Sequence, residues 1–131
     1  MNYNKVKYNP YKKPFGEVMS KKTALPVNAY KDIKHNIGNG RPTILAFGMS
    51  HCYSCLAMSQ VFAEVLEAHP EYQIYSIDSQ KDRLIARDTY KLKEMPTQVF
   101  FNTEGEEVFR HTGAYKKAVL DIILKKWGFD F

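Results

Sequence analysis

Two kinds of segment alternate along the chain. In one kind the apolar residues form a short continuous run, and in the other they recur at helical spacing. The continuous run at 43–47 predicts a strand buried on both faces, because the side chains on both of its sides are apolar. The segment 50–68 has apolar residues at helical spacing with polar residues between them, which predicts one long helix. Ahead of these two elements, 25–27 predicts a short edge strand, and Asn28 is the expected N-cap of a helix over 29–36.

The second half of the chain continues this alternation. Residues 72–77 predict a second core strand, and 82–92 predict a helix whose expected inward-facing residues are Leu84, Ile85 and Tyr90. Residues 97–101 and 107–111 predict the two strands of a hairpin around a turn at 102–105. A final helix follows, with expected core side chains at Ala118, Leu120, Ile122, Ile123 and Trp127. This order predicts an α/β domain with a central mixed β-sheet flanked by helices on both faces.

The length of 131 residues matches one ordinary domain, and 44% hydrophobic with 25% charged residues is typical of a globular chain. No apolar run is long enough to cross a bilayer, so we expect no membrane span. The chain opens at Met1 with polar and basic residues. We therefore expect a cytoplasmic protein, or a periplasmic or otherwise exported one if a signal segment has been removed. The two cysteines exclude a multi-disulfide scaffold and a four-cysteine zinc site within one chain.

The formal net charge of +5 is concentrated at one end of the chain. Residues 1–22 hold six lysines and one acidic residue, whereas the remaining residues are neutral overall. We expect 1–22 to be a basic tail, extended or poorly ordered, ahead of a domain at 23–131. Lysines interleaved with tyrosines also suit contact with RNA or an acidic surface. The neutral body nevertheless argues against a nucleic-acid-binding protein.

The tetrapeptide Cys52-Tyr53-Ser54-Cys55 carries the strongest chemical signal, because it lies where a buried strand is expected to lead into a helix. Unpaired N–H groups and the helix dipole at a helix N-terminus favour a thiolate at Cys52. The spacing of three residues brings Cys55 to the same helix face, within reach of a disulfide. Cys55 lies deeper along the helix, so we expect Cys52 to attack a substrate sulfur and Cys55 to resolve the mixed disulfide.

Other readings of the two cysteines stay open at this point. A zinc site would need two further ligands, and the histidines of the chain lack the spacing of a recurring zinc motif. Met49 together with Cys52 and Cys55 forms a thioether–thiolate set that suits copper(I), in a carrier or binding protein. The cysteines could also be structural and redox-inert. Our primary prediction assigns no metal to the pair.

The tripeptide Met95-Pro96-Thr97 stands directly before the predicted strand 97–101. Proline is unusual there because it cannot donate to a strand ladder. A cis Met95–Pro96 peptide would turn the chain sharply into the strand and leave backbone polar groups facing outward, whereas a trans proline at a loop end is the simpler alternative.

Taken together, the C-x-x-C at a helix start and the proline before a hairpin strand resemble the thioredoxin superfamily, over about residues 25–127. The resemblance implies a thioredoxin-like fold and a thiol–disulfide oxidoreductase active in redox homeostasis. It implies no organic cofactor, because the electrons reside on the two sulfurs. The implied partners are a disulfide- or thiol-containing protein and an upstream redox partner, and we expect a monomer. The remaining alternative within this fold is an interaction module that has no redox activity.

The resemblance also assigns roles to individual residues. It makes Cys52 the nucleophile and Cys55 the resolving thiol. It implies a cis-proline at Pro96 that shapes a substrate groove, with Met95 offering backbone hydrogen bonds to the bound chain. The same surface is expected to include Thr97 and Tyr53, the latter as a contact for partners or as a cover over the disulfide.

Several positions depart from the family pattern. Thioredoxins typically carry Trp-Cys-Gly-Pro-Cys, where this chain has His51 before the first cysteine and Tyr-Ser between the two. The family's buried aspartate and its lysine partner would fall at Ala46 and Ile74, and its helix-kinking proline would fall near Gln60. These departures indicate a specialised thioredoxin-related protein.

His51 and Ser54 are candidates to replace the missing acid. A protonated His51 beside Cys52 would lower the pKa of the thiol, and Ser54 can donate a hydrogen bond to the thiolate. The alternative is that His51 is an exposed flanking residue without such a role. The direction of electron flow does not follow from this sequence.

Overall fold

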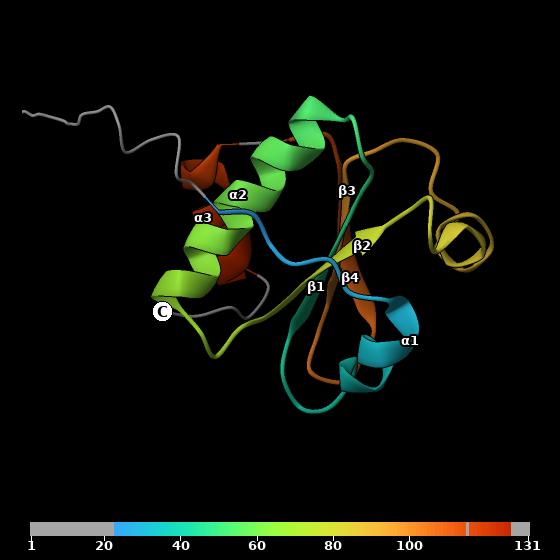
Figure 1. The fold of residues 1–131 in the computed structure, drawn as a ribbon. Helices are drawn as coiled ribbons and strands as arrows, with labels where there is room; N and C mark the ends of the chain where they lie inside the picture. The colour runs from blue at the N-terminus through green and yellow to red at the C-terminus, as the bar shows by residue number, and fades with distance from the viewer. Residues whose placement is uncertain (1–22, 115, 127–131) are drawn as a thin grey trace, which may run out of the picture.

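A four-stranded mixed sheet forms the centre of the molecule (Figure 1). The structure is a computed structural model, and it describes residues 23–114 and 116–126. The strand order is β2-β1-β3-β4, with bounds β1 Thr43–Gly48, β2 Gln73–Asp78, β3 Thr97–Phe101 and β4 Glu107–Thr112. β1 pairs with β2 in parallel and with β3 in antiparallel, and β3 and β4 form the predicted hairpin. The strand predictions are therefore confirmed to within one or two residues at each end.

Helices cover both faces of the sheet, as predicted (Figure 1). α2 (Tyr53–Ala68) and α3 (Lys117–Lys126) lie on one face. The other face carries α1 (Tyr30–Ile33) with its 3₁₀ extension η2 (Lys34–Asn36), and the π-helix η3 (Ile85–Thr89). Each amphipathic helix buries its apolar stripe against the sheet, and the helices that connect the strands therefore cover its two faces.

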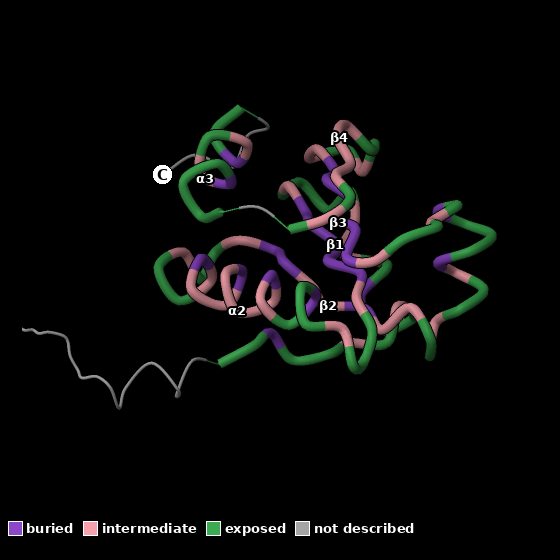
Figure 2. The backbone as a smooth tube through the Cα atoms, turned by 90° about the horizontal axis from the view of Figure 1, so that it is seen from above, coloured by how far each residue is buried: buried purple, intermediate pink, exposed green. Residues whose placement is uncertain are grey.

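The two faces of the sheet make two separate hydrophobic clusters. On the face under α2 and α3, Ile44, Phe62 and Phe100 are completely buried. On the other face, Leu45, Ile77 and Val99 are completely buried beneath α1 and η3. Figure 2 shows the buried residues concentrated along the strands and on the inner sides of α2 and α3. Burying one such side chain stabilises the fold by about 1.5–3 kcal/mol, so these clusters fix both faces of the central strands β1 and β3.

The first predicted elements are shorter than the sequence pattern indicated. The strand expected at 25–27 is a single bridge from Val27 to Ser76, because Pro26 cannot donate to a ladder. Ala29, not Asn28, is the N-cap of α1, and it makes no side-chain capping hydrogen bond. The Asp82 carboxylate, from a distant segment, accepts from the Tyr30 N–H at 2.9 Å in its place.

The helix predicted over 82–92 is mostly a π-helix. The Tyr90 N–H donates to the Ile85 carbonyl, five residues back, which changes the face that each later residue presents. Tyr90 is buried as predicted and Ile85 is half-buried, but Leu84 is 58% exposed and Ala86 takes the inward position. The inward prediction for Leu84 was wrong because Leu84 lies two residues before the buried Ala86, and residues two apart in a helix do not share a face.

α3 confirms the predicted C-terminal helix with a different set of core residues. Leu120 is buried as expected, and Leu124, which was not predicted, is also completely buried. Ile122 is 68% exposed, so its predicted core position is wrong. Ala118 is likewise exposed, whereas Ile123 is half-buried. The predicted core residue Trp127 and the predicted basic tail at 1–22 lie outside the described residues. Within the described part of the chain, no helix is long and apolar enough to span a membrane.

Candidate active site

Cys52 is the N-cap residue of α2, so the helix begins at Tyr53, three residues later than the periodicity predicted. Its extended backbone (φ −118°, ψ 104°) lets its sulfur accept a hydrogen bond from the Cys55 N–H at 3.2 Å. The two sulfurs are joined in a disulfide, with their Cα atoms 5.2 Å apart. The predicted spacing argument is therefore confirmed: three residues across a helix start bring both cysteines into bonding range.

The two cysteines differ in exposure. Cys55 is 8% exposed, whereas Cys52 is half-buried at the edge of the site. Gly48, the last residue of β1, lies directly behind Cys55, and a Cβ added there would stand 3.2 Å from the Cys55 Cβ. A larger residue at position 48 would therefore push the start of α2 away from the strand. Sequence reasoning missed Gly48, although a glycine at the end of a buried strand run just before C-x-x-C is a usable signal.

The Met95–Pro96 peptide is cis, which confirms the prediction. Phe47 pairs with Thr97 across β1 and β3, so the proline loop and the loop that carries Cys52 lie at the same end of the sheet. The Pro96 carbonyl accepts from the Gly113 N–H at 2.8 Å. Among the described residues, the Met95 N–H and carbonyl make no backbone hydrogen bond. These two groups are therefore available to an incoming chain.

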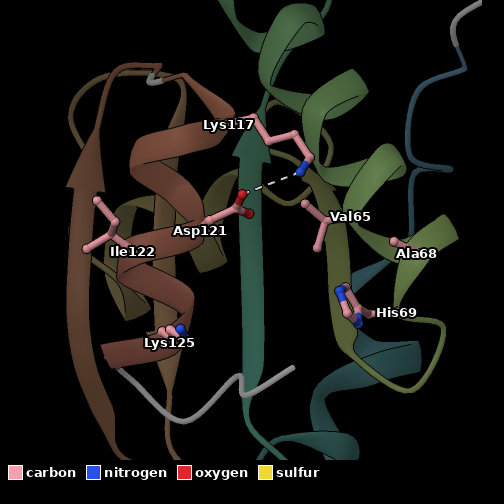
Figure 3. A pocket seen from close by; sticks show the side chains of 7 residues that line it. All are labelled: Val65, Ala68, His69, Lys117, Asp121, Ile122 and Lys125. Atoms are coloured by element: carbon pink, nitrogen blue, oxygen red, sulfur yellow. Dashed lines mark hydrogen bonds and ion pairs between the residues drawn. The ribbon is translucent and has the colours of Figure 1, made fainter.

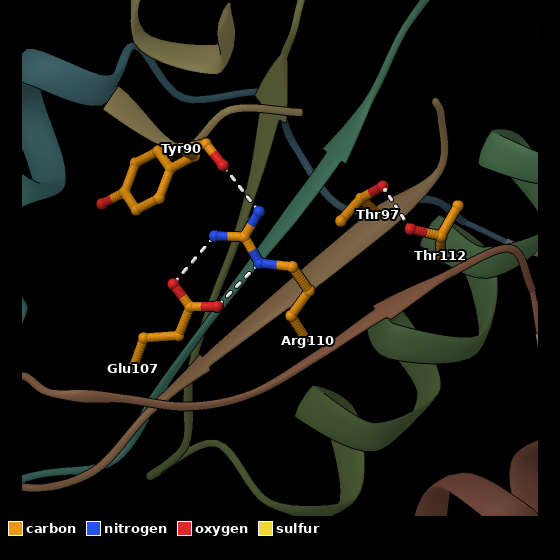
Figure 4. A network of polar contacts seen from close by, with 5 residues as sticks. All are labelled: Tyr90, Thr97, Glu107, Arg110 and Thr112. Atoms are coloured by element: carbon orange, nitrogen blue, oxygen red, sulfur yellow. Dashed lines mark hydrogen bonds and ion pairs between the residues drawn. The ribbon is translucent and has the colours of Figure 1, made fainter. Parts of the chain in front are cut away.

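Thr97 is 1% exposed, and its hydroxyl is engaged inside the protein. It donates to the Glu94 carbonyl at 2.6 Å and shares a hydrogen bond with the Thr112 hydroxyl at 3.2 Å (Figure 4). The side chain thus braces the proline loop against β4. A contact between Thr97 and a partner remains a prediction.

A second brace joins β4 to the segment that leads into the proline loop (Figure 4). The Arg110 guanidinium donates to both carboxylate oxygens of Glu107, at 2.7 and 2.8 Å, and to the Tyr90 carbonyl at 2.6 Å. The hydrogen bond to Glu107 raises the pKa of Arg110. Burial, followed by the hydrogen bond with the Tyr30 hydroxyl, raises the pKa of Tyr90. Sequence reasoning missed this network because its members come from three segments.

Tyr53, Ser54 and His51 lie on the outer side of the disulfide. Tyr53 is 89% exposed at the first turn of α2, a position open to partners. The Ser54 hydroxyl lies 3.6 Å from the Cys52 sulfur, within range of a weak hydrogen bond. His51 is exposed and adopts a left-handed φ of 60°. The tuning roles predicted for His51 and Ser54 remain predictions.

Two cavities meet at Met49. The first, which we call the Asp78 groove, has a volume of about 540 Å³ and reaches both cysteines, with Gly48 and Asp78 in its wall. The second, which we call the Met95 groove, has a volume of about 480 Å³. It is lined by Met49, Ser79, Arg83, Ala86, Arg87, Leu92, Lys93, Glu94 and Met95. Met49 separates the two grooves and belongs to both.

The metal hypothesis keeps its geometric basis, since Met49 lines the same groove as Cys52 and Cys55. Among the described residues, no group of three or more His, Cys, Asp or Glu side chains could hold a metal ion. Copper(I) binding by the Met49 set remains a prediction. The positions where an aspartate and a lysine were expected, Ala46 and Ile74, are both part of the apolar cluster under α2.

A third cavity, of about 390 Å³, lies between the C-terminal end of α2 and α3 (Figure 3). Val65 and Ile122 form its apolar walls, and Lys117 and Asp121 form an ion pair of 3.4 Å at its rim. It lies at the opposite end of α2 from Cys52 and includes neither cysteine. We therefore do not assign it to the active site.

Comparisons with known proteins agree with this architecture. A family model for a thioredoxin-like domain matches residues 29–128. Thioredoxin H5 of Arabidopsis thaliana is 29% identical over 85 residues, which cover 65% of this chain and 70% of that protein. The solved thioredoxin of Fasciola hepatica is 25% identical, with a TM-score of 0.63 over 74% of this chain and 88% of that one. The thioredoxin of Malassezia sympodialis is 21% identical, with a TM-score of 0.65 over 82% and 92% of the two chains.

Proposed function

The chain belongs to the thioredoxin-like family, and from this premise we propose that it is a thiol–disulfide oxidoreductase that exchanges disulfides with a protein partner. Family membership and the C-x-x-C pair support oxidoreductase chemistry in general. The finer proposal is that Cys52 is the nucleophile and Cys55 the resolving thiol. The observation that carries it is the Cys52–Cys55 disulfide at the N-terminus of α2, with Cys52 at the surface and Cys55 behind it.

In the reducing direction, the Cys52 thiolate attacks one sulfur of the partner's disulfide. A mixed disulfide forms between Cys52 and that sulfur, and the partner's other sulfur leaves as a thiolate that takes up a proton from solvent. The Cys55 thiolate then attacks the Cys52 sulfur and displaces the partner's second thiolate. Two electrons pass to the partner, which ends as a dithiol, and the protein ends with the Cys52–Cys55 bond. A dithiol reductant restores the pair, and the reverse sequence would oxidise a dithiol partner.

The local backbone supports the first step. The free N–H groups at the start of α2 and the helix dipole stabilise negative charge on Cys52. The Cys55 N–H points at the Cys52 sulfur from 3.2 Å and would remain a donor to the thiolate. The unpaired N–H and carbonyl of Met95 can pair with the backbone of an extended partner chain, which would hold the partner's sulfur over Cys52.

The test is turnover of an insulin-like protein disulfide with a dithiol reductant. The wild-type protein should accelerate reduction, and Cys52→Ser should have no activity above background. Cys55→Ser should instead trap a mixed disulfide with the substrate that survives denaturation and disappears on reduction. Stoichiometric copper(I) binding without disulfide turnover would contradict the proposal and favour the Met49 carrier. The redox potential of the pair would separate a reductase, near about −270 mV, from an oxidant, near about −120 mV.

A further inference from the structure

The Met95 groove lies beside the Cys52–Cys55 pair. Its lining consists mainly of methionine, other apolar and charged side chains and includes neither cysteine. Met95 directly precedes the cis-proline, and Met49 lies three residues before Cys52. Both thioethers line the groove, so a chain paired with the Met95 backbone would pass over it on its way to Cys52. Methionine side chains adapt to varied apolar neighbours, which suits a surface for partner segments.

The charged side chains of the Met95 groove are mainly basic. Arg83, Arg87 and Lys93 line it, against the single carboxylate of Glu94. Arg83 and Lys93 are exposed and make no ion pair or side-chain hydrogen bond within the described part of the chain. Arg87 is paired at 2.8 Å with its exposed neighbour Asp88. The groove therefore carries a positive charge that its own residues do not neutralise.

The Asp78 groove provides the internal contrast. Its wall contains one carboxylate, that of Asp78, and neither lysine nor arginine among the described residues. The excess of positive charge is thus confined to the side of the disulfide where the cis-proline loop lies. The described body has little net charge, so this positive lining is a local feature and does not reflect the overall charge of the chain.

From this arrangement we infer that the preferred partner carries acidic residues next to its reactive cysteine, and that Arg83 and Lys93 select it. This inference rests on the proposed exchange activity and names its substrate class. Guanidinium and ammonium groups attract carboxylates in the encounter, and an arginine can hold one carboxylate with two hydrogen bonds. The apolar part of the partner segment would lie against Met49 and Met95.

Matched peptides test the inference. Each peptide has one cysteine joined by a disulfide to a chromophoric aromatic thiol. The three residues that flank this cysteine are all glutamate in the first peptide, all lysine in the second and all serine in the third. The reduced full-length protein attacks the peptide sulfur, the aromatic thiolate leaves, and its absorbance reports the rate. We expect the glutamate peptide to react about tenfold faster than the lysine peptide at low salt, with the ratio falling towards one as salt screens the charges. Equal rates for these two peptides would overturn the inference.

The variant Arg83→Glu/Lys93→Glu should reverse the preference. Lys116→Glu/Lys125→Glu is the matched control, because it changes the net charge equally at exposed positions of the α3 segment. The control should keep the wild-type ratio, and a glutamate preference retained in the Arg83/Lys93 variant would overturn the inference. The control should react with the serine peptide at the wild-type rate. An unchanged thermal unfolding midpoint of the Arg83/Lys93 variant shows that it is folded, and its reaction with the lysine peptide shows that exchange is intact.

Two further outcomes separate the possible failures. If none of the peptides reacts with the wild-type protein, the proposed exchange function fails, and the inference fails with it. If all peptides react equally, the exchange function stands and only the charge selection fails. Glutathione joined to the same chromophore provides the small-molecule comparison. A rate for glutathione above that of the glutamate peptide would overturn the assignment of the groove to a protein segment.

Discussion

The two grooves that meet at Met49 expose different chemistry at one reactive pair. The Asp78 groove is lined by both cysteines and by Gly48, which lies close to Cys55. The Met95 groove reaches neither sulfur, but it combines two thioethers with three cations. Under the proposed function and the inferred charge selection, the Asp78 side fixes the geometry of the disulfide, and the Met95 side determines which partner is held. Changes on the two sides should therefore alter different measurements.

The largest expected effect comes from replacing Cys52, because every exchange reaction starts at its sulfur. Cys52→Ser should reduce exchange with every peptide to the uncatalysed background, whatever the charge of the peptide, because the attacking sulfur is gone. Single-turnover absorbance measures this directly. Residual charge-dependent exchange in Cys52→Ser would mean that Cys55 can attack partners itself.

On the Asp78 side, Gly48→Val should destabilise the oxidised protein by about 1–3 kcal/mol, because the new side chain overpacks the contact with Cys55. Urea unfolding of the oxidised form measures the loss. The preference between glutamate and lysine peptides should stay at the wild-type ratio. Ser50→Ala, at an exposed position of the same groove, is the control and should leave stability nearly unchanged.

On the Met95 side, Arg110→Gln should lower stability by roughly 1–2 kcal/mol, because it removes the paired donors to Glu107 and the hydrogen bond to the Tyr90 carbonyl. Thermal unfolding measures the loss. Loosening this brace should also slow exchange with all three peptides by a similar factor, since the proline loop is positioned less well. A change confined to the glutamate peptide would indicate instead that Arg110 contacts the partner.

The smallest effect should come from Asp88→Asn, which frees the charge of Arg87. The hydrogen bond from Arg87 lowers the pKa of Asp88, so the pair remains ionised at neutral pH and is lost only as the pH falls through that lowered value. Removing the carboxylate should increase the glutamate preference by about twofold. Asp121→Asn, which removes a carboxylate from an exposed ion pair on α3, should leave the preference unchanged.

Predictions from local pattern succeeded where neighbouring residues decide the outcome. The buried run of β1, the alternation of β2 and the hairpin of β3 and β4 all formed where expected, because strand burial follows from adjacent side chains. The predictions failed at Leu84 and Ile122 because each lies two residues from a buried position, and residues two apart in a helix do not share a face. Leu84 lies before the π-helix and two residues from the buried Ala86. In α3, Leu120 and Leu124 form the buried face of the helix, and Ile122 lies between them on the exposed side.

The amino-acid sequence alone determined that a C-x-x-C begins a helix after a buried strand, and that a proline precedes the hairpin. Both are properties of contiguous residues, so their signal is local. Only the tertiary structure decided that Met49 and Met95 share one groove with Arg83 and Lys93, and that Asp82 caps Tyr30. Those residues come from separate segments that strand pairing brings together, and no spacing along the chain encodes such a meeting.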